Sequence, residues 1–97
     1  MLDTALASAR NQEQRLSHAR TALTGALLGA HSQIDEARRA MSGGRAGVDA
    51  RTRLAEAERQ LMLAESEADP VEALDAARRA TTAARDADAL ARYAAMR

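Results

Sequence analysis

The side chains that could carry out chemistry in this sequence are two histidines and several closely spaced carboxylates. His18 and His31 are too far apart in sequence to lie one helical turn from each other, which is the spacing of two imidazoles that bind one metal ion from a helix. Glu56 and Glu58 are two residues apart, so their carboxylates point to different faces of a helix. These spacings predict neither a metal site nor an acid–base pair.

The glycine-rich stretch 43–47 has a composition that can cradle a phosphate group. It lacks the preceding strand and the lysine of a phosphate-binding loop. The chain has no cysteine, and Tyr93 is its one aromatic residue, which excludes thiolate chemistry and aromatic ligand pockets. We therefore expect a protein that is not an enzyme, with no catalytic, cofactor-binding or metal-binding residues, no cofactor and no small-molecule substrate.

Charge and hydropathy argue against two further kinds of partner. Fourteen arginines balance fourteen aspartates and glutamates among 97 residues, and the adjacent arginines at 38–39 and 78–79 stand beside acidic residues. Nucleic-acid binding requires clustered positive charge, so no nucleic-acid partner is expected. No apolar run approaches the ~20 residues that cross a bilayer, so we expect contact with a membrane only through a longer parent chain.

The elements that must position these residues are helices. The composition is rich in Ala, Arg, Leu and Glu, contains one proline and is typical of long helices and coiled coils. A first helix is expected over 3–41, because apolar residues recur there with alternating spacings of four and three. Gly25 and Gly29 do not interrupt this pattern. We predict a continuous or gently bent helix whose two glycines pack closely against an Ala-rich helix.

A glycine-rich turn over 42–48 separates the first helix from the second. Three glycines within it offer the left-handed conformation that ends helices, and the apolar periodicity does not continue across them. The second helix is expected over 49–68, with Asp49 as its N-cap.

The third helix has the clearest local start signal in the chain. Asp69 is expected to cap it, Pro70 to occupy its first position, and Glu72 to complete a capping box. The helix is expected over 70–96, with a seam made almost entirely of alanine. The sequence thus predicts an all-α fold, a three-helix antiparallel bundle or coiled coil with a long first helix, in a single helical domain over 1–97.

The first helix is too long for the two shorter helices to cover. It spans ~60 Å against ~30 and ~40 Å for the other two, which leaves an apolar stripe in water at its N-terminal end. Interaction residues are therefore expected along this stripe: Leu2, Leu6, Glu13, Leu16, Arg20 and Leu23. The partner is a second copy or another helical segment of the parent protein. An antiparallel homodimer centred near Leu16 would set Glu13 of one chain against Arg20 of the other.

Two stretches carry a family resemblance. Residues 50–61 read ARTRLAEAERQL and residues 68–80 read ADPVEALDAARRA. Together with the small-residue turn before them, they resemble the C-terminal helical region of actinobacterial TPM-domain membrane proteins. The resemblance implies a fragment of a larger membrane-anchored protein, with this domain on the cytoplasmic side. It implies a non-catalytic interaction or scaffold domain that self-associates or packs on a partner through Ala and Leu heptad seams.

Two other classes of function remain open. A peripheral membrane-surface protein of the phage shock protein A type clusters basic residues opposite bulky apolar ones. Here Arg10, Arg15 and Arg20 supply charge with little apolar bulk. A small secreted helical hairpin of the WXG type would match the length and the central glycine turn. The chain has no tryptophan, and Arg97 stands where the export signal of that class has an acidic residue.

Overall fold

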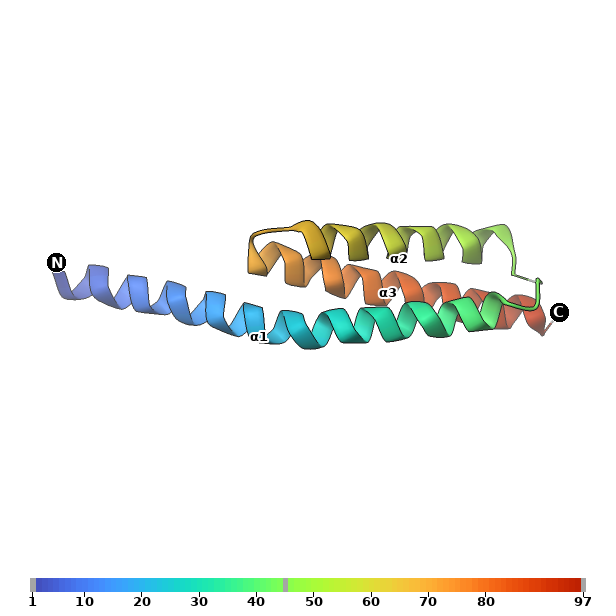
Figure 1. Ribbon diagram of the computed structural model, residues 1–97, viewed down its shortest axis with the longest axis horizontal. Coiled ribbons are helices and arrows are strands. Elements are labelled where there is room, and N and C mark those ends of the chain that lie inside the picture. Colours follow the sequence, from blue (N-terminus) through green and yellow to red (C-terminus); the bar gives the residue numbers. More distant parts are fainter. Residues whose placement is uncertain (1, 45, 97) are drawn as a thin grey trace.

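The computed structural model describes residues 2–44 and 46–96 and has three helices in that part of the chain, α1 (Leu2–Met41), α2 (Val48–Ser66) and α3 (Pro70–Ala95). They run up, down and up, so α2 is antiparallel to both α1 and α3 (Figure 1). The molecule measures 65 × 17 × 16 Å because α2 and α3 lie beside only the C-terminal part of α1. The prediction of an all-α three-helix bundle with a long first helix is confirmed.

The long helix α1 is continuous through both internal glycines, as the unbroken heptad pattern predicted. The expected close packing at these glycines is wrong. Gly25 and Gly29 are exposed, and a Cβ atom added to either would meet nothing within 4 Å. The reason is that α2 and α3 lie against other faces of α1, so these two glycines face solvent.

The connection between α1 and α2 differs in detail from the prediction. Gly44 has a φ of 75° and its N–H donates to the carbonyl of Met41 at 3.2 Å, which closes the end of α1. The N-cap of α2 is Gly47, with no side-chain cap, and not Asp49 as predicted. Because the helix begins at Val48, Asp49 falls inside its first turn. Its negative charge there still stabilises the helix by interacting with the positive end of the helix dipole.

The start of α3 confirms two of its three predicted features. The Asp69 carboxylate accepts a hydrogen bond from the N–H of Val71 at 2.9 Å, and Pro70 stands in the first turn. The expected reciprocal bond from Glu72 is not made. Glu67, in the short turn after α2, accepts from the Asp69 N–H at 3.1 Å instead, because the tight turn brings its side chain back onto this amide.

Alanines of α3 form the centre of the core. Its buried residues are Ala73, Leu74, Ala76, Ala77, Ala80, Ala83, Ala84, Ala87 and Ala91. Small side chains let helix backbones approach closely, and α3 accordingly packs tightly against both other helices, whereas α1 and α2 touch each other much less. Ile34 of α1 and Leu61 of α2 supply bulk to the same cluster.

Candidate interaction surface

The chemically reactive side chains do not converge anywhere in the part of the chain that the structure describes. No group of three or more His, Asp or Glu side chains there could hold a metal ion. His31 and Glu65 form one contact between α1 and α2, with Nε2 and Oε2 3.2 Å apart and both side chains about half exposed. His18 lies in a different region, beside Asn11 and Arg15 on α1.

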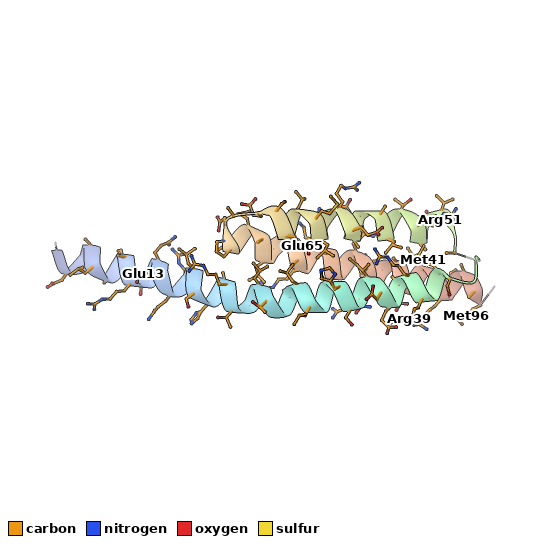
Figure 2. The ribbon with its side chains drawn as sticks, in the orientation of Figure 1. Glu13, Arg39, Met41, Arg51, Glu65 and Met96 are labelled. Atoms are coloured by element: carbon orange, nitrogen blue, oxygen red, sulfur yellow. The ribbon has the colours of Figure 1, made fainter. Side chains whose placement is uncertain are left out.

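The N-terminal part of α1 extends beyond the bundle as a single helix. We call residues 3–15 the projecting segment, since every one of them is exposed. Leu6 is 50% exposed although it occupies the heptad seam. Figure 2 shows Glu13 on this segment, away from α2 and α3. The segment therefore carries its seam into solvent, and its base at Gln12 and Arg15 lies beside the start of α3.

The six predicted interaction residues fall into three groups. Leu6, Glu13 and Arg20 are exposed, and Leu16 is half-buried. The side chain of Leu2 lies outside the described residues. Leu23 belongs to the chain's own core, because it packs against the buried cluster that includes Ala64 of α2 and Ala76 and Ala77 of α3.

The bundle first comes near α1 beside residues 12–20. There Gln12 and Arg15, at the base of the projecting segment, line a shallow hollow with Leu16, Arg20 and the start of α3 at Asp69, Pro70 and Val71. From Leu23 onward the seam of α1 is half-buried or buried within the chain. The free seam is thus bounded by the helix tip at one end and by the α2–α3 turn at the other.

Ion pairs join the three helices of the bundle. Arg38 of α1 binds Glu58 of α2, with Nη2 and Oε2 2.6 Å apart, and Arg53 of α2 binds Asp86 of α3 at 2.7 Å. The hydrogen bond that Arg38 donates to Glu58 raises the pKa of Arg38. These side chains are substantially exposed, and such surface pairs contribute little individually. They connect α2 to both other helices at the surface of the bundle.

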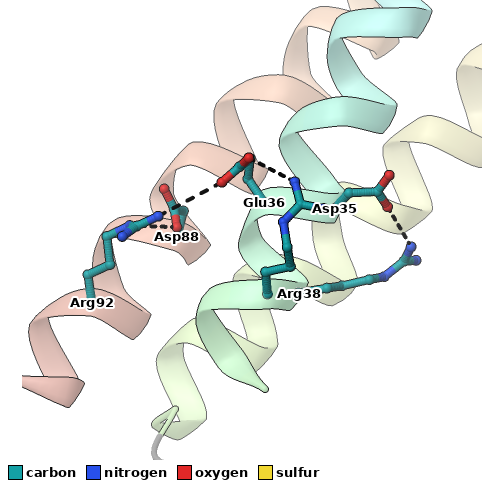
Figure 3. A network of polar contacts seen from close by, with 6 residues as sticks. Asp35, Glu36, Arg38, Asp88 and Arg92 are labelled. Carbon is teal, nitrogen blue, oxygen red and sulfur yellow. Dashed lines mark hydrogen bonds and ion pairs between the residues drawn. The ribbon is translucent and has the colours of Figure 1, made fainter. Parts of the chain in front are cut away.

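A second polar group links α3 to α1 (Figure 3). Arg92 donates from Nε to the carboxylate of Asp88 at 2.9 Å and lies 3.9 Å from Glu36 of α1. Glu36 also accepts from Arg39 at 2.8 Å, which raises the pKa of Arg39. Both networks lie within the bundle, and neither includes a residue of the projecting segment.

The pKa of one carboxylate of α2, that of Glu56, is lowered by neighbours on the same helix. The side-chain amide of Gln60 donates to Glu56 at 2.9 Å, and Arg59 also pairs with it, so the pKa of Glu56 is lowered. A lowered pKa in the folded state means that this contribution to stability is present above the ordinary carboxyl pKa and is lost as the pH falls through the lowered value.

Comparisons with protein-family models, with curated proteins and with solved structures find no match to this chain. Within the described residues, no helix combines the length and apolar character that a membrane crossing requires.

Proposed function

We propose that this chain is a non-catalytic helical interaction domain. In this proposal the three-helix bundle is a rigid support, and the projecting segment of α1 binds another α-helix along its seam. The observation that carries the proposal is the exposure of all residues in 3–15, including Leu6, on a helix whose seam keeps the same heptad spacing as the buried part but carries Glu13 at one of its positions.

The energetics of short helices support this function. The projecting segment prolongs a helix that is already nucleated in the bundle, so backbone hydrogen bonds alone hold it, whereas packing supplies most of the stability of helices in proteins. The projecting segment has no packing of its own. A partner helix along the seam would supply it and would shield Leu6 and the exposed side of Leu16 from water.

Membrane-surface binding fits the same segment less well. Such binding requires an apolar face with bulk and a basic face opposite it. Between residues 3 and 15, Leu6 is the one large apolar side chain. Arg10 and Arg15 point to different sides of the helix instead of forming one basic face.

We extend the proposal to a membrane-anchored parent protein with this domain on the cytoplasmic side, on the strength of the resemblance to TPM-domain proteins alone. An antibody against the bundle should then detect a longer, membrane-bound chain whose helical region resists protease added outside intact cells. Recovery of the whole chain in the supernatant after membranes are sedimented would contradict this extension.

The interaction function is tested by site-specific photo-crosslinking in the cells that produce the protein. A photoreactive phenylalanine analogue at Leu6 should capture a protein, either a further copy or another chain. The matched control carries the analogue at Thr4, which is exposed on the same turn but about half a turn around the helix. Equal or absent capture at the two positions would overturn the proposal.

A further inference from the structure

We propose that the partner of the projecting segment is the same segment of a second copy, antiparallel, with Leu6 of each chain beside Leu16 of the other. This inference rests on the proposed function and names the partner. In this arrangement the two bundles lie at opposite ends of the assembly. The projecting segments lie side by side between them.

The bundle limits how far two copies can overlap. Leu23 and Leu27 of α1 already pack against the core of their own chain, so a second helix can follow the seam only as far as about Arg20. The register centred near Leu16 would place Leu6 of one copy opposite Leu27 of the other. Leu27 already packs against the core of its own chain and does not offer its side chain to a second copy. The pairing must be centred nearer the tip, at the level of Asn11.

Charges along the seam select this register. In an antiparallel pair, each side chain of one seam row inserts beside a residue of the other row and the residue that follows it. With Leu6 beside Leu16 of the second copy, Glu13 inserts beside Ala9 and Arg10 of that copy. Arg20 likewise inserts beside Asp3 of the second copy. Each charged seam residue therefore lies beside an opposite charge. Because the pair is two-fold symmetric, each of these contacts occurs twice.

Neighbouring registers place like charges together. An overlap shorter by one heptad sets Glu13 beside Asp3 of the second copy. An overlap longer by one heptad sets Arg20 beside Arg10 and drives the tip of each helix against Leu27, where the bundle already occupies the seam. Because like charges in contact disfavour an arrangement, neither alternative competes.

A parallel pair is disfavoured for the same reason. Parallel in-register helices place equivalent seam residues opposite each other, so Glu13 would face Glu13 and Arg20 would face Arg20. It would also bring both bundles to the same end of the assembly. The antiparallel register therefore satisfies both the charges and the position of the bundle.

The interface is short, so association is expected to be weak and visible at roughly tens to hundreds of micromolar chain. Sedimentation equilibrium over that range should show a monomer–dimer equilibrium for the natural chain. Glu13→Arg and Arg10→Glu, each alone, place like charges at two symmetric contacts and should weaken dimerisation by about tenfold or more. Arg85→Glu, on the exposed surface of α3, is the control and should leave dimerisation unchanged.

The decisive sample is an equimolar mixture of Glu13→Arg and Arg10→Glu. In the mixed dimer both symmetric contacts again join opposite charges, so association should return to about the level of the natural chain. A mixture that stays as weak as its components would overturn the register. A natural chain that is monomeric throughout would overturn the second copy as partner.

Disulfide trapping tests the register independently of sedimentation. Since the chain has no cysteine of its own, any disulfide joins the introduced residues. Leu6→Cys mixed with Leu16→Cys should cross-link faster under mild oxidation than either variant alone. Self-linking of Leu6→Cys at the same rate would contradict the antiparallel arrangement. A monomeric chain that still captures a different protein specifically from Leu6 in cells would remove this inference and leave the proposed function in place.

Discussion

Gly25 and Gly29 reduce the stability of α1 without any packing benefit within the chain. Both are exposed and a Cβ atom would meet nothing at either position. We therefore expect Gly25→Ala and Gly29→Ala each to raise the free energy of unfolding by about 0.5–1 kcal/mol, measured by urea denaturation.

Gly44 is the matched control for these substitutions. Its φ of 75° is strained for any residue with a Cβ atom, so Gly44→Ala should lower stability. A loss of stability in Gly25→Ala or Gly29→Ala would mean that the glycine face of α1 is already in contact with something, contrary to the structure.

Asp69 is the residue whose local role is best defined. Its carboxylate accepts the Val71 N–H at the start of α3, and loss of such a cap costs about 1 kcal/mol. We expect Asp69→Ala to show that loss in chemical denaturation, while Asp69→Asn keeps most of the stability because the amide oxygen also caps well. Equal effects of the two substitutions would argue against the cap.

The small side chains of α3 set the spacing between helices. Ala84 is fully buried where α3 meets both α1 and α2. Ala84→Leu should therefore overpack the core and lower the free energy of unfolding by about 1–3 kcal/mol. Ala89→Leu makes the same change on an exposed face of α3 and should be nearly neutral. Similar thermal midpoints for the two variants would contradict the close packing.

Local signals in the sequence were sufficient to predict where the helices lie. They were not sufficient to predict which face of each helix packs against the others. The Asp69–Pro70 start of α3 could be predicted because capping depends on residues close in sequence. The N-cap of α2 was misplaced because Gly47 and Asp49 both suit a helix start, and propensity alone does not choose between them.

The free surface of α1 could be predicted only in outline. The seam keeps one heptad spacing from the tip to the glycine-rich turn, and although Glu13 and Arg20 make its N-terminal half less apolar, the spacing does not fix the level at which α3 begins to cover it. That boundary, near Leu16 and Arg20, depends on the lengths and offset of α2 and α3. Leu23 was included among the interaction residues for this reason. Asp3 and Arg10 lie beside the seam. They become candidate contacts of Arg20 and Glu13 in a second copy only when the boundary of the free seam is known.

At the scale of the whole molecule, we expect the bundle to be stable without the projecting segment, which adds no contacts to the buried core. Deleting residues 3–12 removes exposed helix alone, so the thermal midpoint of the bundle in dilute solution should change little, by the equivalent of less than about 0.5 kcal/mol. Deletion through Leu27 also removes core contacts and should destabilise the bundle severely. A large loss from the shorter deletion would show that the extension supports the fold.

The measurement that tests the central claim most directly is amide hydrogen exchange of residues 3–15 at low and high chain concentration. In dilute solution these amides should exchange much faster than those of α3, because a helix end without packing opens locally. At high concentration the account predicts slower exchange in 3–15 and unchanged exchange in α2 and α3. Exchange in 3–15 that is equally fast at both concentrations would contradict the pairing of this segment with a second copy.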